Sequence, residues 1–524
     1  MANTGLLVLT NPTKVKKLLP IIKEHVLKTL YIQYFPEKNL FISGNYTVAS
    51  PQCKVTRYVQ TITNIYTETS AISARLDIRV LLTSMKNPNL SVINTKKPIE
   101  VVIFDRICSK READTFMQDC LANTSMDCSF VTFNDDQKLE KESLIPCIED
   151  EKLYKSVVLG GTFDRLHNGH KIFLSEAVLR CTQQLTVGVT NTNMLHGKLL
   201  WELIEPCSKR ILNITEFLED IDSTLVYNVV AINDMYGPTK SDPTFEMIVV
   251  SEETKRGGEK VNEMRVQNNL NKLDICVVKL LEDEDHRDHE ESKLSSSNNR
   301  IRLLGTRLRP PRIDDKPLKP YIIGLTGGIA SGKSSIADKL EKLGAGLVNC
   351  DKIAHNLYQP GKSCYDAILK TFGPTILKSD GFINRKALGD IVFHDKAQLD
   401  KLNKLVWPII LDEAKKQMND FYAKGFDIIV IEAAVLIQAK WQYVCHEIWT
   451  CIVPPEEAIK RVIDRNGLTP DDAKARIQVQ PSNVEQVNEA NVVICSLWSH
   501  DITQRQVQKA WNELMAFLSE QVKS

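Results

Sequence analysis

The sequence predicts a multi-domain α/β protein built on parallel sheets, and three observations support this fold class. The chain has 524 residues, which is more than a single hydrophobic core accommodates, and suggests about three domains. Short apolar runs alternate with helix-length segments, which is the order of βαβ units. Two of these runs, 154–159 and 321–325, end in glycine-rich turns that lead into helices.

Composition narrows the class of protein. Lys+Arg 66 balance Asp+Glu 66, so no overall basic field exists to hold a nucleic acid, and we expect no nucleic-acid partner. The 13 cysteines include no Cys-x-x-Cys pair, which favours reduced thiols in an intracellular compartment over a disulfide framework. The apolar runs are much shorter than the roughly 20 residues of a transmembrane helix.

Residues 1–150 are predicted to be an α/β region without catalytic function, because they contain no phosphate loop, metal cluster or nucleophile arrangement. We expect a first strand at 6–10, a helix near 21–29 that starts at Pro20, and strands at 78–82 and 101–104. The first 36 residues are basic, so a mitochondrial address and peripheral mitochondrial membrane association through this region remain alternatives. The predicted location is cytoplasmic, mitochondrial or both.

Residues 151–304 form the second predicted domain. A buried strand at 154–159 ends at a glycine pair, and further strands are expected at 185–189, 225–230 and 247–250. The acidic stretch 282–291 and the serines after it have the composition of a linker. Clustered prolines predict a true linker at 305–320, followed by a third domain at 321–524 that ends in an amphipathic helix with Val507, Trp511, Leu514 and Leu518 on one face.

A phosphate loop opens the third domain. Its G-x-x-x-x-G-K-[ST] pattern lies between a strand and a helix expected to begin near Ser335. Backbone N–H groups of such a turn bind phosphate oxygens, the lysine contacts the β and γ phosphates, and the hydroxyl can ligate Mg²⁺. The predicted ATP contacts are Gly327, Gly328, Ile329, Ala330, Ser331, Gly332, Lys333 and Ser334, with Ser334 as the metal ligand.

Phosphate loops occur in ATPases, GTPases and small-molecule kinases. The guanine-reading pattern Asn-Lys-x-Asp is present at 271–274, but it precedes the loop instead of following it, so we favour a kinase. A kinase requires a carboxylate near the end of a neighbouring strand, and Asp351 follows the apolar run 346–350. The alternative for Asp351 is an N-cap of the helix from Lys352. Arg461, Arg465 and Arg476 either close over phosphates or are solvated.

The third domain resembles dephospho-coenzyme A kinases over nearly its whole length. The matching segments are 324–334, 351–355, 380–388 and 461–480. The resemblance implies transfer of phosphate from ATP to the ribose 3′-hydroxyl of dephospho-coenzyme A. It further implies catalytic roles for Lys333, Asp351 and Arg465, and substrate contacts for Arg385 and Arg476.

The second domain carries His-x-G-His at 167–170, directly after a strand and at the start of a helix. Paired histidines are more often packing or surface residues, but the preceding Gly-Thr-Phe-Asp and the strand, turn and helix order resemble the nucleotidyltransferase superfamily. Within that superfamily, the domain resembles phosphopantetheine adenylyltransferases of the eukaryotic and archaeal type. This implies that His170 contacts the α-phosphate of ATP and His167 supports the nucleotide phosphates. Lys198 would neutralise either the attacking phosphate or the α-phosphate, and Thr162 would donate to the substrate phosphate.

The same resemblance implies a set of ATP contacts spread along the second domain. It includes part of the apparent linker, whose serines could bind phosphate as a nest does, and leaves only the acidic residues as a solvated insertion. The implied residues are Gly161, Thr162, Phe163, Glu253, Thr254, Asn262, Arg265, Ser295, Ser296, Ser297 and Arg300.

The domain order resembles the bifunctional coenzyme A synthase family of animals, in which the N-terminal region is non-catalytic. This implies conversion of 4′-phosphopantetheine and ATP to dephospho-coenzyme A and pyrophosphate, followed by phosphorylation with a second ATP and Mg²⁺. Two alternatives remain. Asn349 and Gln438 replace acidic residues of the kinase family, so a regulatory protein that binds nucleotides without turnover is one. An RNA-modifying enzyme built on His-x-G-His is the other, and the zero net charge disfavours it.

Overall fold

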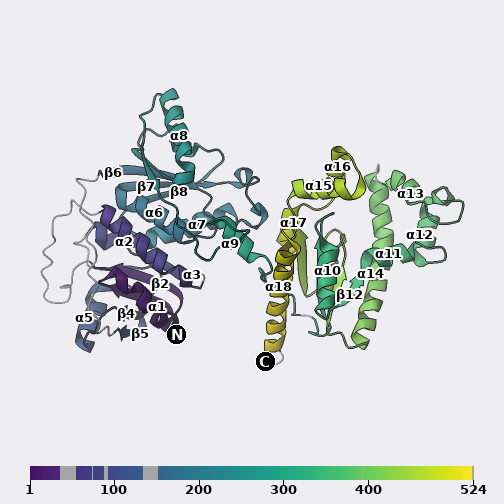
Figure 1. The fold of residues 1–524 in the computed structure, drawn as a ribbon, viewed down its shortest axis with the longest axis horizontal. Helices are drawn as coiled ribbons and strands as arrows, with labels where there is room; N and C mark the ends of the chain where they lie inside the picture. Colours follow the sequence, from purple (N-terminus) through teal and green to yellow (C-terminus); the bar gives the residue numbers. More distant parts are fainter. Residues whose placement is uncertain are drawn as a thin grey trace. The chain divides into compact units, whose positions relative to one another are not determined.

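The computed structural model describes residues 1–35, 55–73, 75–87, 92–133, 152–314, 316–392 and 395–521. Its strands form three five-stranded sheets in which every strand pairing is parallel, so the predicted α/β class is confirmed (Figure 1). The described residues form two compact units, Met1–Asn299 and Arg300–Ser524. The first unit contains two of the sheets and the second unit contains the third.

The first sheet has the strand order β3-β2-β1-β4-β5. The apolar run from Leu6 to Leu9 is buried in its central strand. The helix predicted near 21–29 is wrong in position, since it spans 15–25 with Pro20 inside it, and 26–34 form a strand whose aromatic and β-branched residues are buried. The elements are β1 (Ala2–Leu9), α1 (Val15–His25), β2 (Val26–Tyr34), α2 (Val55–Glu68), α3 (Ser70–Ser73), β3 (Asp77–Val80), α4 (Thr83–Lys86), β4 (Ile99–Phe104), α5 (Lys110–Cys120) and β5 (Thr124–Thr132).

The second sheet has the order β10-β9-β6-β7-β8, so its first strand along the chain is again central. The second and third strands lie on one side of it and the fourth and fifth on the other, as in the first sheet. The strand order reverses at β6, where ligands of open parallel sheets bind. The elements are β6 (Tyr154–Gly161), α6 (Asn168–Arg180), β7 (Cys181–Thr190), α7 (Cys207–Ile221), β8 (Val226–Ile232), β9 (Met247–Ser251), α8 (Lys255–Gln267), β10 (Asp274–Val278) and α9 (Ser296–Leu303).

The third sheet has the order β12-β13-β11-β14-β15, with the third strand along the chain inserted beside the first. The last helix buries Val507, Trp511 and Leu514, which confirms the predicted apolar face. The elements are β11 (Tyr321–Gly327), α10 (Lys333–Lys342), β12 (Gly346–Asn349), α11 (Cys350–Leu357), α12 (Ser363–Phe372), α13 (Arg385–Val392), α14 (Lys396–Ala423), β13 (Ile428–Glu432), β14 (Glu447–Ile452), α15 (Pro455–Asn466), α16 (Pro470–Gln478), α17 (Asn483–Glu489), β15 (Val492–Cys495) and α18 (His500–Gln521).

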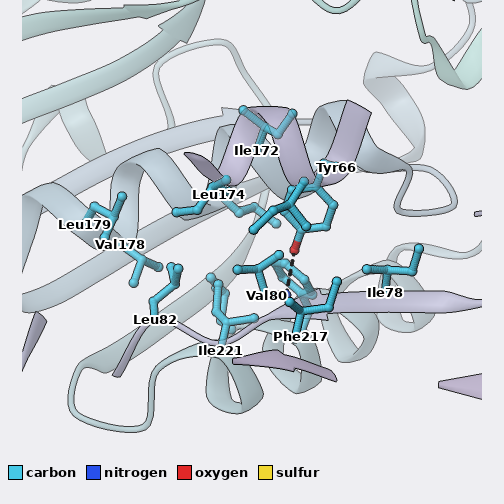
Figure 2. Close-up of a cluster of buried hydrophobic side chains, with 14 of the residues drawn as sticks. Tyr66, Ile78, Val80, Leu82, Ile172, Leu174, Val178, Leu179, Phe217 and Ile221 are labelled. Atoms are coloured by element: carbon cyan, nitrogen blue, oxygen red, sulfur yellow. Dashed lines mark hydrogen bonds between the residues drawn. The ribbon is translucent and has the colours of Figure 1, made fainter. Parts of the chain in front are cut away.

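The two sheets of the first unit share one hydrophobic core. Figure 2 shows Tyr66, Val80 and their neighbours from the N-terminal region packed among Ile172, Phe217 and other side chains of α6 and α7. The Tyr66 hydroxyl also accepts a hydrogen bond from the Val80 amide at 3.1 Å within this core. The N-terminal region therefore supplies part of the core against which α6 and α7 fold.

The acidic segment before the serines is not simply a solvated insertion, and that expectation is wrong for Asp283. Its side chain is 4% exposed and accepts a hydrogen bond from Asn298 Nδ2 at 3.1 Å. Its backbone amide bonds to the Ser292 carbonyl at 2.8 Å, so the segment folds back on itself. Among the residues that the structure describes, no helix combines the length and apolar character needed to cross a bilayer.

Candidate active sites

The turn after β6 is held in a strained shape by Asp164. Phe163 and Arg165 have φ values of 52° and 46°, a region that non-glycine residues rarely adopt. The fully buried Asp164 carboxylate accepts hydrogen bonds from Arg165 Nη1 and from the Glu205 amide, each at 3.0 Å. These bonds fix the chain between the central strand and α6, which is the segment that carries the histidines.

The two predicted histidines face each other at the start of α6. His167 occupies the N-cap position with extended backbone, and His170 lies in the first turn of the helix. Their rings stack with centroids 3.8 Å apart, and Phe163 packs 5.3 Å from the His170 ring. A Cβ on Gly169 would lie only 3.1 Å from His167 Nδ1, so glycine at this position leaves room for the ring to fold back over the helix.

Burial keeps both imidazoles neutral. It lowers the pKa of His170 to about 3, with a further contribution from the positive charge of Lys198, and it holds the pKa of His167 well below its usual range. Both Nδ1 atoms are enclosed and have no hydrogen-bond partner among the described residues. Neutral rings at a helix N-terminus can orient phosphate oxygens by donating N–H groups.

Arg210 of α7 braces this site, although no sequence motif pointed to it. The side chain is fully buried, and its guanidinium donates to the carbonyls of Thr162, Thr190 and Glu205 at 2.6, 2.9 and 2.8 Å. It therefore ties together the carboxyl ends of β6 and β7. The Thr190 hydroxyl adds a bond to the Thr162 hydroxyl at 3.1 Å. An arginine that donates only to backbone carbonyls requires no particular residue types at fixed positions, so no sequence motif identifies it.

The serine segment lies at the same turn as the histidines. The Ser296 hydroxyl donates to the Asp164 carbonyl at 3.1 Å, and a Cβ on Gly169 would lie 3.9 Å from the Leu294 carbonyl. Ser295 accepts from the Asn298 amide at 3.1 Å. Residues 295–297 thus adjoin the His-x-G-His turn, and Ser297 and Arg300 lie on the helix that the segment begins.

Other predicted ATP contacts carry structural bonds in the described fold. Asn262 both donates to and accepts from the backbone of Leu273, at 2.9 and 2.8 Å. The fully buried Arg265 donates to the carbonyls of Asn271, Thr239 and Asp242, which leaves Nη2 without a partner among the described residues.

The remaining predicted contacts lie around β6 and β9. Glu253 forms an ion pair with Lys293, and Thr254 caps the turn after β9 through the Ser251 amide at 2.9 Å. Gly161 ends β6, where a Cβ would lie 3.0 Å from the Phe163 ring.

The phosphate loop borders a cavity of about 630 Å³ in the second unit. Glycine is required at two positions of the phosphate loop. A Cβ on Gly327 would lie 2.6 Å from the Cys451 carbonyl, and Gly332 has a φ of 89°. The helix after the loop begins at Lys333, two residues earlier than expected. The cavity is lined by residues 327–335 together with Asp351, Ala434, Arg461, Arg465, Gln480, Ser496, Trp498, His500 and Thr503.

Glu432 adjoins the phosphate loop, and like Arg210 it was not predicted from the sequence. It is 1% exposed, and its Oε1 accepts from Lys333 Nζ at 2.8 Å and from the Ser334 hydroxyl at 2.9 Å. Asn349 Nδ2 donates to Oε2 at 2.5 Å. The apolar run 428–432 ends in this acid, and β13 pairs directly with β11, so a search for acids at the ends of buried strands could have found it.

The remaining kinase residues are partly gathered around the loop. Asp351 has an exposed carboxylate 3.9 Å from Lys333 Nζ, and the N-cap of its helix is Asn349, not Asp351. Arg461 donates to the Ser496 hydroxyl and carbonyl at 2.7 Å and to the Ala330 carbonyl at 3.3 Å, so it braces the loop. Arg465 lines the cavity, whereas Arg476 is exposed on α16 and does not line it. Arg385 opens α13, and its side chain lies outside the described residues.

Three families match successive parts of the chain. A COASY N-terminal domain matches residues 3–129, a cytidylyltransferase-like family matches 158–302, and dephospho-CoA kinase matches 321–497. The dephospho-CoA kinase of Carboxydothermus hydrogenoformans is 41% identical over 186 residues, which cover 36% of this chain and 90% of that protein. That of Symbiobacterium thermophilum is 37% identical over 190 residues, which cover 36% and 80%.

Among solved structures, the chain is similar to the dephospho-CoA kinase from Campylobacter jejuni. It is 26% identical, covers 37% of this chain and 97% of that chain, and has a TM-score of 0.30.

The folds and sites define a nucleotidyltransferase joined to a phosphate-loop kinase. The chain belongs to the dephospho-CoA kinase family through its C-terminal unit, and the three matched domains together are those of a bifunctional coenzyme A synthase.

The neutral histidines predict a pH-dependent stability. The unfolded chain binds a proton at His170 below its usual pKa of about 6.5, whereas the folded chain does not until about pH 3. Stability is therefore fully present above about pH 6.5 and falls as the pH decreases, by at most about 1.4 kcal/mol per pH unit for this group. Thermal unfolding of the full chain at pH 7.5 and 5.5 should show a smaller loss for His170→Gln than for wild type. Equal losses would contradict the neutral, buried state of this ring.

Proposed function

We propose that the chain carries out the last two steps of coenzyme A synthesis at two separate sites. In the first, ATP transfers its adenylyl group to 4′-phosphopantetheine, which yields dephospho-coenzyme A and pyrophosphate. In the second, another ATP phosphorylates the ribose 3′-hydroxyl of dephospho-coenzyme A. The observation that carries this proposal is that one chain places a neutral His-x-G-His pair and a lysine-bearing phosphate loop at the ends of two central strands.

The first reaction needs no nucleophile from the protein. A phosphate oxygen of 4′-phosphopantetheine attacks the α-phosphorus of ATP, and the bond to pyrophosphate breaks. His170 donates an N–H to the α-phosphate as charge develops, and His167 does the same for the leaving phosphates. Lys198, whose charge already acts on His170, neutralises the attacking phosphate. The Thr162 hydroxyl, held by Thr190, orients that phosphate at the end of β6.

The second reaction uses the cavity around the phosphate loop. The exposed Asp351 carboxylate is placed to accept the proton of the ribose hydroxyl as it attacks the γ-phosphate. Lys333, 3.9 Å from that carboxylate, contacts the β and γ phosphates, and Arg465, which also lines the cavity, adds a second positive charge. Loop amides bind the remaining phosphate oxygens.

The residues around Ser334 fit a magnesium ion. The Ser334 hydroxyl and the Glu432 carboxylate lie 2.9 Å apart and offer the hard oxygen ligands that Mg²⁺ prefers. When bound there, Mg²⁺ neutralises charge on the β and γ phosphates. Asn349 departs from the family pattern, but its amide holds Glu432, so the departure is compatible with a working site.

Domain limits, location and partners are part of the proposal. We place a non-catalytic region at 1–150, the adenylyltransferase at 151–304, a linker at 305–320 and the kinase at 321–524, with small-molecule substrates only. A cytoplasmic or mitochondrial location fits this chemistry. Peripheral contact with a mitochondrial membrane would use exposed lysines of α1 such as Lys16 and Lys17, because the apolar run Leu6 to Leu9 is buried in the first sheet.

Replacing His170 tests the first site. His170→Ala should lower pyrophosphate release from 4′-phosphopantetheine and ATP by about 10² to 10³, because one preorganised phosphate donor is lost. Phosphorylation of added dephospho-coenzyme A should continue at the wild-type rate, since that site lies in the other compact unit. Both activities are followed by chromatography of the nucleotides. Wild-type pyrophosphate release by the variant would contradict the assignment.

Replacing Lys333 tests the second site. Lys333→Ala should leave dephospho-coenzyme A accumulating from 4′-phosphopantetheine and ATP, because the loop loses the charge that contacts the transferred phosphate. Lys339→Ala, on an outer face of the same helix, is a matched control and should not change the product. Formation of coenzyme A by Lys333→Ala at the wild-type rate would rule out this kinase site.

A further inference from the structure

Helix α6 carries the histidine pair and is enclosed on all of its faces. Its buried positions do not form a single stripe but follow one another along the helix, as in a helix covered from both sides. They are Asn168, Lys171, Ile172, Leu174, Ser175, Glu176, Ala177, Val178 and Leu179. The second sheet covers one side, and α2 and β3 of the N-terminal region cover the other (Figure 2).

Asn168, the variable residue of His-x-G-His, bonds to the N-terminal region. Its side chain is 2% exposed, and Nδ2 donates to the Tyr66 carbonyl at 2.7 Å. Tyr66 lies in the last turn of α2, and its carbonyl also accepts from the hydroxyls of Ser70 and Thr69 at 3.0 and 3.2 Å. The residue between the two histidines is therefore tied to a helix about 100 positions earlier in the chain.

Lys171 makes a second tie immediately after His170. Its ammonium is buried and donates to Asp77 Oδ1 at 2.7 Å and to the Ile78 carbonyl at 2.8 Å. Burial lowers the pKa of Lys171, although the Asp77 carboxylate opposes this effect. Arg79 bridges Asp77 at 2.7 Å and also bonds to the fully buried Asp220 side chain of α7. Arg79 also pairs with Glu216 of α7 at 3.2 Å, so two cations and three carboxylates interact where the two regions meet.

In the N-terminal sheet, a side chain of the protein occupies the position where a ligand would bind. At its central strand the amides of Thr10 and Asn11 donate to the buried Asp105 carboxylate at 2.7 and 3.1 Å, and Lys14 donates to the Asp105 carbonyl at 2.7 Å. These amides follow β1 at the point where the strand order reverses, which is where such sheets bind phosphate. An internal carboxylate already takes that place, so the role of this region lies elsewhere.

We infer that the N-terminal region is a working part of the adenylyltransferase, because Tyr66 and Asp77 hold Asn168 and Lys171 and thereby set the positions of His167 and His170. Asn168 and Lys171 are positioning residues in this inference, which rests on the proposed function of the first site. The two ties flank His170 on α6, and Lys171 also closes the first helical turn by donating its amide to the His167 carbonyl at 3.0 Å. Loosening either tie displaces donors that must meet the phosphates accurately.

The test compares Asn168→Ala with wild type as full chains. The expected result is a kcat for pyrophosphate release about 10- to 100-fold lower, with KM for ATP and 4′-phosphopantetheine nearly unchanged, because the histidines act mainly in the transition state. Asn123→Ala is the matched control. It removes the same kind of bond, from Asn123 Nδ2 to the Thr95 carbonyl at 2.8 Å, away from α6, and should retain the wild-type kcat. An unchanged kcat per folded Asn168→Ala molecule would overturn the inference.

A double-mutant cycle keeps the test decisive if the alanine variant folds poorly. Asp77→Asn and Lys171→Met should each lower kcat, since each removes the ion pair between Lys171 and Asp77. In the first variant Lys171 keeps its bond to the Ile78 carbonyl, and in the second Asp77 keeps its pair with Arg79. The double variant should lose no more than the worse single variant, and additive losses would overturn the inference. Phosphorylation of dephospho-coenzyme A by the same samples should stay unchanged. If the wild-type protein releases no pyrophosphate, the proposed function is wrong. If it does, and Asn168→Ala has the same kcat, only the positioning role of Asn168 is wrong.

Discussion

The carboxyl end of a central parallel strand is the constraint on which all three domains depend. A central strand is hydrogen-bonded to a neighbour on each side. The backbone amides of the turn that follows its carboxyl end lie outside the sheet, where they can bind a ligand or a side chain. After β6 this turn presents two histidines, after β11 it presents the phosphate loop, and after β1 its amides are taken by Asp105. One backbone geometry thus gives two phosphate sites and one position closed by the protein itself.

Burial decides how the first of these sites is built. An exposed imidazole would be charged for part of the physiological pH range, whereas burial lowers the pKa of His170 to about 3 and keeps its ring neutral. The second sheet covers one side of α6, the helix that carries this residue. The N-terminal region covers the other side through Tyr66 and its neighbours, and it belongs to the same compact unit.

Local motifs made both sites predictable, while the groups that support them were not. The phosphate loop and His-x-G-His each consist of residues that follow one another in the sequence, so the spacing within each motif predicts its geometry directly. Glu432 and Arg210 act on residues 98 and 48 positions away, and only the strand order brings them there. The expectation for Asp283 was wrong because composition describes only the average polarity of a segment, whereas this carboxylate is buried with hydrogen bonds from Asn298 and from the Asp285 amide.

The most direct test of two consecutive sites in one chain is the stoichiometry of its products. Purified full-length protein is supplied with 4′-phosphopantetheine, excess ATP and Mg²⁺, and pyrophosphate, ADP and coenzyme A are measured over time. The account predicts one pyrophosphate and one ADP for each coenzyme A formed, with dephospho-coenzyme A appearing first. Release of ADP without pyrophosphate, or of pyrophosphate without subsequent ADP, would show that one of the two sites does not perform the reaction assigned to it.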